Sequence, residues 1–374
     1  MPKIVFVATE DWFFASHFLP MARTAVGMGL ETVVVARERS HRGAIEATGA
    51  RLVPLEAERR SLDPRAVWRT ARDLAALLRR EKPDIVHCIS LKPMLIGGAA
   101  ARLAGLRGVV FALTGLGFLG ARQDRAGRGA RFLLRRILLG ALATGEARFL
   151  FENRDDPELI GLRADDPRVV VVGGAGIDPG VLPALPMPSG ETLRIAIVAR
   201  MLWSKGIDTA VEAVGLARRA GAMVELSLFG APDPSNPRAI AEATLREWSQ
   251  RPGIQWWGPT RDVGAVWAAH HLACLPSRGG EGLPRTLLES ASSGRAALTT
   301  DVPGCRSFVR DGLDGLVVPP DDPQALADAI VALARDRAQV AALGASAAAR
   351  VRAGYTEADV RQAMETLYRE MLDG

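Results

Sequence analysis

Two glutamates stand eight positions apart in a glycine-rich segment near the C-terminal end of the chain. Glu281 lies within the segment SRGGEGLP, residues 277–284, and Glu289 lies in the helical pattern that follows. Glycines let a backbone approach a ligand closely, and Pro284 suits the first position of a helix, where N–H groups favour an anion such as a diphosphate. The segment therefore predicts an anion-binding loop whose two carboxylates can accept hydrogen bonds from hydroxyl groups of the same ligand.

Two cations follow an apolar strand pattern earlier in the chain. Residues 193–199 are expected to form a buried strand, and Arg200 and Lys205 come after it. Cations that converge on one point at a strand end suit a diphosphate whose negative charge grows as it departs. Most single arginines and lysines are merely solvated, so the position after a strand is what favours a binding role for this pair.

The length and composition of the chain limit its class. Its 374 residues exceed the usual size of one hydrophobic core, which predicts two domains. With 48% hydrophobic and 5% aromatic residues, the composition favours a soluble α/β protein over a β sandwich or a disordered chain. Cys88, Cys274 and Cys305 show no metal-binding spacing, and the chain starts directly with a strand pattern. We therefore expect a cytoplasmic protein without a signal peptide, and without a membrane span because no apolar run approaches about 18 residues.

Apolar, β-branched runs alternate with Ala-, Leu- and Arg-rich helical patterns along the chain. In the first half the expected strands are 4–8, 32–36, 52–55, 84–88 and 109–113, and 63–80 is expected to be a helix. In the second half the expected strands are 193–199, 224–229, 254–257, 272–275, 296–299 and 315–318. Such alternation predicts parallel sheets with helices on both faces.

Glycines and prolines between residues 173 and 190 separate the two halves. We therefore expect two doubly wound, Rossmann-like α/β domains that face each other across a cleft. The first comprises residues 1–177, the linker 178–190, and the second 191–354; a C-terminal helix over 355–374 is expected to pack back on the first domain. Because open α/β sheets bind ligands beyond the carboxyl ends of their strands, the functional residues should follow strands.

The charged motifs together resemble those of the family 4 retaining glycosyltransferases, which have the two-domain GT-B fold. Glu281 and Glu289 match the E-x7-E motif of that family. Residues 200–206 resemble its R-x4-K-G element, although Ala199 stands where the family usually has glycine. The likeness continues through residues 258–263, 303–304 and 311–316, so it covers the whole second domain.

The resemblance implies a role for each residue of the donor side. Arg200 and Lys205 would hold the diphosphate of a nucleotide-sugar donor, assisted by the backbone N–H groups of Gly282 and Leu283. The first domain would bind the acceptor.

The resemblance also implies a different role for each of the two glutamates. Glu289 would hold the ribose, and Glu281 would contact hydroxyl groups of the transferred sugar and orient it for reaction with retention. No D-x-D sequence occurs in the chain, which agrees with a GT-B enzyme that needs no metal ion and no other cofactor.

A histidine follows the first expected strand. His17-Phe18-Leu19-Pro20 resembles an H-R-L-P element of the family, with phenylalanine at the arginine position. His17 is therefore a candidate for the acceptor side, and His87 is a weaker one because a single histidine is more often structural.

A second glycine-rich loop follows the fifth expected strand. Thr114-Gly115-Leu116-Gly117 begins a G-x-G-x-x-G pattern, but dinucleotide-binding loops follow the first strand and have an acid about 20 residues later, which is missing here. The loop instead resembles the T/E-G-L-G loop of bacterial glycosyltransferases that extend undecaprenyl-diphosphate-linked saccharides, including the GalNAc transferases of protein glycosylation. Thr114, Gly115 and Gly117 are therefore expected on the acceptor side.

The first half of the chain carries the positive charge. The net charge is +5, with an excess of seven basic residues in 1–190 and an excess of two acidic residues in the remainder. Between residues 128 and 148, arginines at helical spacing accompany Phe132 and Leu133, which suits a basic amphipathic helix in an anionic membrane interface. A domain helix with solvated arginines is the alternative. Nucleic acid is not expected as a partner because no nucleic-acid-binding module is recognisable.

The leading hypothesis is a retaining glycosyltransferase on the inner face of the cytoplasmic membrane. It would move a sugar from a nucleotide sugar, UDP-linked and carrying for example an N-acetylhexosamine, to a lipid-linked saccharide. One alternative is a nucleotide-sugar 2-epimerase of the same fold, which would need a suitably placed histidine, and the second domain has only His270 and His271. Another is a non-catalytic nucleotide-sugar-binding protein, against which the presence of all four charged motif residues argues.

Overall fold

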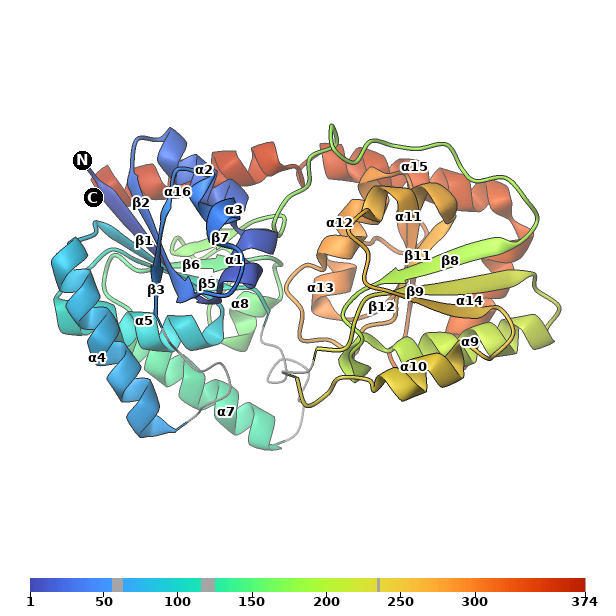
Figure 1. Ribbon diagram of the computed structural model, residues 1–374, viewed down its shortest axis with the longest axis horizontal. Coiled ribbons are helices and arrows are strands. Elements are labelled where there is room, and N and C mark those ends of the chain that lie inside the picture. The colour runs from blue at the N-terminus through green and yellow to red at the C-terminus, as the bar shows by residue number, and fades with distance from the viewer. Residues whose placement is uncertain (56–62, 116–124, 234–235, 374) are drawn as a thin grey trace. The chain divides into compact units, whose positions relative to one another are not determined.

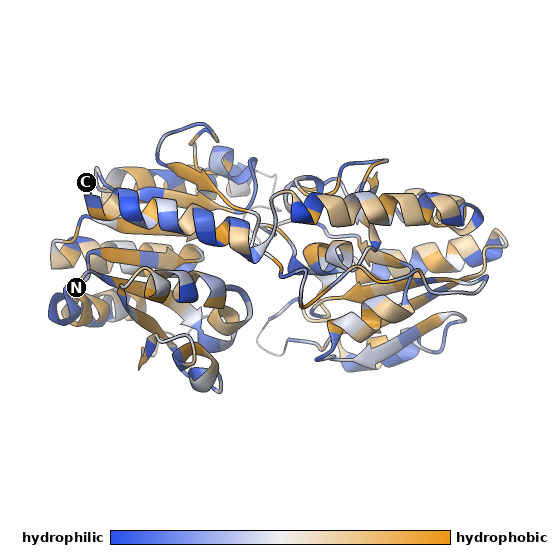
Figure 2. Cartoon of the chain, turned by 90° about the horizontal axis from the view of Figure 1, so that it is seen from above, coloured by the Kyte–Doolittle hydropathy of each residue, from blue (hydrophilic) through white to orange (hydrophobic). Residues whose placement is uncertain are grey.

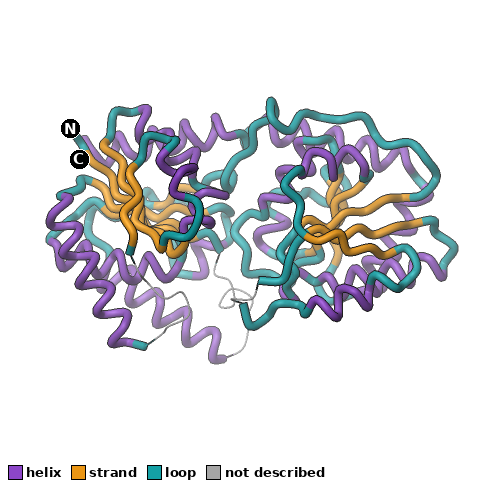
Figure 3. The backbone as a smooth tube through the Cα atoms, viewed as in Figure 1, coloured by secondary structure: helices purple, strands orange, loops and turns teal. Residues whose placement is uncertain are grey.

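The computed structural model divides into two compact units, each built on a parallel β-sheet (Figures 1 and 3). Unit 1 comprises Met1–Ala175 and Glu357–Gly374, and unit 2 comprises Gly176–Thr356. The structure describes residues 1–55, 63–115, 125–233 and 236–373. Both sheets have helices on both faces, which confirms the predicted pair of doubly wound α/β folds.

The sheet of unit 1 has seven parallel strands in the order β3-β2-β1-β4-β5-β6-β7. The strands are β1 (Lys3–Glu10), β2 (Glu31–Arg37), β3 (Arg51–Pro54), β4 (Ile85–Ile89), β5 (Val109–Leu113), β6 (Arg148–Phe151) and β7 (Val169–Val171). The first five were predicted. The last two, of four and three residues, were not predicted.

Alternate residues of the central strand β1 face two separate helical layers. Among the described residues, the helices of unit 1 are α1 (Asp11–His17), α2 (Leu19–Gly27), α3 (Arg42–Glu46), α4 (Pro64–Glu81), α5 (Leu91–Ala104), α7 (Arg125–Arg135), α8 (Asp156–Leu159) and α16 (Glu357–Asp373), and a π-helical segment covers Arg136–Leu142. Val5 and Val7 belong to the core under α4 and α5, whereas Ile4 and Phe6 belong to the core under α1, α2 and α16. In Figure 2 the strands are largely hydrophobic, while the covering helices alternate hydrophobic and hydrophilic residues.

The C-terminal helix α16 is part of unit 1. Its buried face includes Met364 and Tyr368, and the Tyr368 hydroxyl lies 2.9 Å from Nδ1 of His87 in β4. His87 is fully buried and also lies against the ring of Phe6, with 5.1 Å between ring centroids. Burial lowers the pKa of His87 to about 3. His87 is therefore a neutral core residue that ties α16 to the sheet.

The sheet of unit 2 has six parallel strands in the order β10-β9-β8-β11-β12-β13. They are β8 (Leu193–Val198), β9 (Val224–Phe229), β10 (Ile254–Gly258), β11 (Leu272–Leu275), β12 (Ala296–Thr300) and β13 (Gly315–Val318). All six were predicted. The helices are α9 (Ile207–Arg219), α10 (Glu242–Trp248), α11 (Val263–Ala269), α12 (Arg285–Ser292), α13 (Pro303–Arg306), α14 (Pro323–Arg335) and α15 (Arg337–Arg352), and a 3-10 turn covers Trp203–Lys205.

The glycine- and proline-rich segment 178–190 is part of unit 2 and packs against its other residues. Arg295 has no exposed surface and donates hydrogen bonds to the carbonyl oxygens of Leu185 and Pro186 in this segment, as well as to that of Trp267. A segment without regular secondary structure cannot satisfy its carbonyl groups in a helix or sheet, so side-chain donors do so instead.

The predicted amphipathic helix between residues 128 and 148 is shorter than expected. It begins within α7, continues as the π-helical segment to Leu142, and is followed by β6, which starts at Arg148. Leu138 packs in the core, whereas Phe132 and Leu133 are 63% and 59% exposed. Within the part of the chain that the structure describes, no helix is both long and apolar enough to cross a membrane.

Candidate functional site

The predicted donor residues come from two neighbouring strands of unit 2. Strands β8 and β11 pair in parallel in the middle of the sheet, so their carboxyl ends lie at the same edge. β8 leads to Arg200 and to the turn that contains Lys205, and β11 leads to the glycine-rich loop 277–283. This edge is where open α/β sheets bind ligands.

Lys205 and Glu281 meet at this edge. Nζ of Lys205 donates a hydrogen bond to Oε2 of Glu281, and Oγ of Ser277 donates one to Oε1 at 2.7 Å. The side chains of Lys205 and Glu281 are only 14% and 19% exposed. The carboxylate of Glu281 is therefore held on both oxygens in a partly buried site.

Two glycines of the predicted motifs allow backbone segments to approach one another. Gly206 has a φ of +67°, and a Cβ atom there would lie 1.9 Å from the carbonyl oxygen of Pro276, just before the glycine-rich loop. A Cβ atom at Gly304 would lie 2.4 Å from the carbonyl oxygen of Gly282. Only glycine fits at these positions, because any side chain would push the Lys205 turn or the α13 turn away from the loop.

The loop continues into α12, which carries Glu289. Gly282 and Leu283 are buried, and Leu283 packs in the core next to α12. The helix begins at Arg285, and Pro284 precedes it with extended backbone angles of −63° and 118°. The prediction that Pro284 takes the first helical position was therefore wrong by one residue.

Glu289 lies within α12 and is 12% exposed. Nε of Arg285, one helical turn earlier, donates to its Oε1 at 2.9 Å. Burial raises the pKa of the Glu289 carboxyl, and Arg285 opposes part of that rise. A carboxylate in this setting is a strong acceptor for a ligand hydroxyl group.

Arg200 has a different partner from Lys205. Its side chain is 44% exposed, and its Nη1 pairs with Oδ2 of Asp233 at 3.0 Å, beyond the end of β9. The structure thus joins Lys205 directly to Glu281 and directs Arg200 toward Asp233.

Arg278 was not predicted as a site residue, although it lies inside the glycine-rich loop. Its Nη1 and Nη2 bind the two carboxylate oxygens of Asp208 at 2.8 and 2.9 Å. The hydrogen bonds with Asp208, together with those to Asp321, hold the pKa of Arg278 above its ordinary value despite partial burial. The available sequence signal was its place three residues before Glu281.

The predicted acceptor residues lie in unit 1. His17 is the last residue of α1, with its Nδ1 2.6 Å from Oγ of Ser16. Thr114 follows β5, and its Oγ1 lies 3.1 Å from Oγ of Ser90, which follows the adjacent strand β4. Gly115 has a φ of +101°, and Gly117 lies outside the described residues.

Ser90 is a residue that the sequence reasoning missed. It has φ +74° and ψ 160°, a conformation that is nearly confined to glycine. Since β4 and β5 are neighbouring parallel strands, Ser90 and Thr114 share one edge of the sheet. Among the described residues, no group of three or more His, Cys, Asp or Glu side chains is placed to hold a metal ion.

Both units match known glycosyltransferase families. Residues 3–143 match the family model described as "Glycosyl transferase 4-like", and residues 192–336 match the one described as "Glycosyl transferases group 1".

Two curated proteins of similar sequence differ in how much of this chain they match. An exopolysaccharide phosphotransferase of Streptomyces coelicolor is 31% identical over 229 residues, which are 60% of this chain and 23% of the relative. The N,N'-diacetylbacillosaminyl-diphospho-undecaprenol alpha-1,3-N-acetylgalactosaminyltransferase of Campylobacter jejuni is 23% identical over 334 residues, which are 86% of each chain. The chain spans less than half the length of the first curated relatives that it matches.

Solved structures extend the likeness to the whole chain. Anabaena HepE in complex with UDP-glucose has a TM-score of 0.76 at 16% identity, covering 99% of this chain and 100% of that chain. This likeness confirms the GT-B fold class. With one family model on each unit, residues 3–143 belong to the glycosyl transferase 4-like family and residues 192–336 to the glycosyl transferases group 1 family.

Proposed function

We propose that the protein is a retaining glycosyltransferase that moves a sugar from a UDP-linked donor, such as a UDP-N-acetylhexosamine, to a lipid-linked saccharide. The observation that carries this proposal is the partly buried contact of Lys205 and Ser277 with Glu281 at the carboxyl ends of β8 and β11. It combines a cation for a phosphate with an oriented carboxylate for a sugar hydroxyl group.

In this proposal the cations act on the departing nucleotide. Transfer breaks the bond between the anomeric carbon and the diphosphate oxygen and forms a bond to an acceptor hydroxyl oxygen, so negative charge grows on the diphosphate. The ammonium group of Lys205 has three N–H donors, so it can bind a phosphate oxygen while it keeps its contact with Glu281. Arg200 uses Nη1 for Asp233 and has further donors on the same guanidinium group. No metal ion is required when these two side chains neutralise the charge.

The two glutamates bind different parts of the donor. Glu281 accepts hydrogen bonds from hydroxyl groups of the transferred sugar, and Ser277 fixes the orientation of its carboxylate. Glu289 accepts hydrogen bonds from the ribose, and the backbone at Gly282 and Leu283 lies beside the diphosphate. Retention of configuration is part of the proposal, as in the family that the motifs resemble.

The histidines of unit 2 favour this activity over epimerisation. His271 accepts a hydrogen bond from the backbone N–H of Arg194 at 3.0 Å, and its Nε2 lies 2.9 Å from the carbonyl oxygen of Pro188. His270 is also buried, with Nδ1 2.7 Å from the carbonyl oxygen of Val266. Burial lowers the pKa of both, to about 4 for His271. Both rings are thus engaged with backbone groups, and neither is placed as a proton-transfer group for an epimerase.

The acceptor is assigned to unit 1. The Campylobacter jejuni relative has a name that describes a diphospho-undecaprenol-linked acceptor. We place the acceptor near His17, Thr114 and Gly115, with Ser90 beside Thr114. The saccharide part would be bound there, while its lipid stays in the membrane.

A surface of α7 suits peripheral contact with an anionic membrane. Phe132 and Leu133 are largely exposed, and Arg128 and Arg136 are exposed on the same helical segment. Exposed apolar side chains flanked by arginines favour the interface of an anionic bilayer. The protein would therefore work at the inner face of the cytoplasmic membrane.

An assay with labelled UDP-sugars and an undecaprenyl-diphosphate-linked saccharide tests the proposal. A radiolabelled lipid product is expected, and its α or β linkage relative to the donor reports retention or inversion. Release of an epimerised nucleotide sugar would support the 2-epimerase instead. Binding of the nucleotide sugar without any turnover would support a non-catalytic binding protein.

A further inference from the structure

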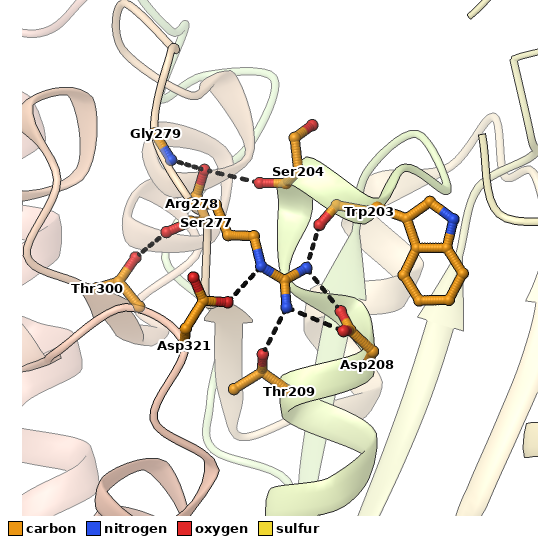
Figure 4. A network of polar contacts seen from close by, with 9 residues as sticks. All are labelled: Trp203, Ser204, Asp208, Thr209, Ser277, Arg278, Gly279, Thr300 and Asp321. Atoms are coloured by element: carbon orange, nitrogen blue, oxygen red, sulfur yellow. Dashed lines mark hydrogen bonds and ion pairs between the residues drawn. The ribbon is translucent and has the colours of Figure 1, made fainter. Parts of the chain in front are cut away.

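Arg278 connects the glycine-rich loop to three other segments of unit 2 through its guanidinium group (Figure 4). Nε contacts Asp321, Nη1 contacts Asp208 and the carbonyl oxygen of Trp203, and Nη2 contacts Asp208 and, at 3.2 Å, Oγ1 of Thr209. A guanidinium group has five N–H donors. Each of the five therefore has a partner within the protein.

The backbone beside Arg278 is tied to the same region. Its N–H donates to the carbonyl oxygen of Ser204 at 2.9 Å, next to Lys205 in the sequence. The hydroxyl of Thr300 donates to the carbonyl oxygen of Ser277, and Oγ of Ser277 accepts from the N–H of Gly279 at 3.3 Å. The loop is thus held on both sides at residues 277–279, shortly before Glu281.

We propose that Arg278 is a positioning residue for the donor site. It fixes the turn that carries Lys205 against the loop that carries Glu281, so that ammonium and carboxylate keep their mutual contact when a donor binds to both of them. Its effect on catalysis rests on the proposed function, whereas its effect on the loop does not. Because its five donors already have partners, Arg278 acts through Lys205 and Glu281 and does not itself hold a phosphate.

The geometry requires arginine in particular. The planar fork matches the carboxylate of Asp208 with two parallel bonds while Nε faces Asp321 in the opposite segment. A lysine has three donors at one point and cannot span these partners. Trp203 holds the start of the turn that carries Lys205, because its ring packs edge-to-face on Trp248 of α10 with 6.0 Å between centroids.

The decisive variants are Arg278→Lys and Asp208→Asn. Arg246→Lys is the matched control, since Arg246 forms an exposed ion pair with Glu242 on α10 in the same unit. The first readout is amide hydrogen exchange of the purified full-length protein without ligand. We expect residues 203–206 and 276–284 to exchange faster in both variants, with the strands of unit 2 unchanged, and no change in the control.

The second readout is steady-state kinetics with UDP-N-acetylgalactosamine and an undecaprenyl-diphosphate-linked saccharide. We expect kcat to fall roughly 10- to 100-fold, since a displacement of about 1 Å in a reacting site has such an effect, with the donor KM changed by less than about threefold. The double variant should lose no more activity than the less active single variant, because the bonds that Asp208→Asn breaks are among those that Arg278→Lys breaks.

Unchanged exchange of both loops in Arg278→Lys, or a kcat within about twofold of wild type, would overturn the proposal. If Arg278→Lys does not fold, Asp208→Asn decides the question by the same criteria. If the wild-type protein itself transfers no sugar, the proposed function fails, and the exchange measurement still confirms or overturns the positioning role.

Discussion

Nζ of Lys205 donates a hydrogen bond to Oε2 of Glu281, although the two residues are 76 positions apart in the sequence. Their strands, β8 and β11, are neighbours in a parallel sheet, so the loops that follow them leave the same edge. The two charges satisfy each other in a partly buried site. A donor diphosphate has to share the ammonium group, which makes this pair the first place to test the proposed activity.

Removing either charge should abolish most of the transfer activity. For Lys205→Ala and Glu281→Gln we expect kcat/KM to fall by roughly two or more orders of magnitude, because Lys205 acts on developing charge and Glu281 orients the sugar. Initial rates of transfer from a UDP-sugar measure the effect. Glu242→Gln, which changes an exposed glutamate of α10, serves as the control and should be neutral. Near-normal rates in both site variants would remove Lys205 and Glu281 from the proposed mechanism.

A methyl group at Gly206 should disturb the proposed donor site by steric contact. Gly206→Ala places Cβ 1.9 Å from the carbonyl oxygen of Pro276, whereas Gly221→Ala has a similar φ of +86° with nothing within 4 Å. We expect Gly221→Ala to cost about 1 kcal/mol of unfolding free energy for its backbone conformation, and Gly206→Ala roughly 2 kcal/mol more for the overlap. Urea unfolding of the two variants separates these effects. Equal losses would show that the close approach does not matter.

Stability should fall in mild acid because of His87. Its pKa is about 3 in the folded protein against an ordinary value of 6.5 for histidine, so the unfolded chain takes up a proton first as the pH falls. The contribution of His87 is complete above pH 6.5 and is lost progressively down to about pH 3, by roughly 1.4 kcal/mol for each pH unit.

The His87 contribution can be isolated by comparison with His87→Gln, which does not titrate. Between pH 7.5 and pH 5.5 the wild-type protein should lose about 1.4 kcal/mol more unfolding free energy than the variant. Urea unfolding at the two pH values measures this. Parallel pH profiles for the two proteins would contradict the assignment of a buried neutral histidine.

Arg295 should be important for the stability of unit 2. Its buried guanidinium group donates to three backbone carbonyl oxygens, two of them in segment 178–190. Arg295→Lys keeps the charge but cannot reach all three, so we expect a loss of roughly 3 kcal/mol. Thermal unfolding tests this, with Arg246→Lys as the exposed control. A melting temperature within about 1 °C of wild type would mean that the segment is held by other contacts.

The exposed apolar pair on α7 should contribute to membrane binding. Replacing Phe132 and Leu133 by alanine removes apolar surface without changing charge, and sedimentation with phosphatidylglycerol vesicles should then decrease. Leu313→Ala, at a 55% exposed leucine of unit 2, should have no effect. Binding to phosphatidylcholine vesicles should be weak for all proteins, since the arginines need an anionic surface. Unchanged sedimentation of the double variant would exclude this surface as the membrane contact.

Much of the architecture could be predicted because it depends on local patterns. Continuous apolar runs such as 109–113 and 272–275 are recognisable as buried parallel strands, and they occupy the predicted residues in the structure. Strands β6 and β7 were not predicted, and in the structure they extend the sheet by pairing with β5 and with each other.

The residue types of the proposed donor site were also accessible from the sequence, since Lys205, Glu281 and Glu289 stand in recognisable motifs after strands. The residues that these side chains contact could not be predicted from the sequence. Arg278 looked like one more residue of a glycine-rich loop, and its function depends on Asp208 and Asp321, which come from two other segments.

The sequence by itself determined the sheets and the chemical groups at their edges, because hydrophobic periodicity and turn residues act over a few positions. The tertiary structure alone decided that Lys205 contacts Glu281, that Arg200 turns to Asp233, and that His87 is buried against Tyr368. The physical reason is that a side chain's partner depends on strand order and loop path, which bring together residues that no local pattern connects.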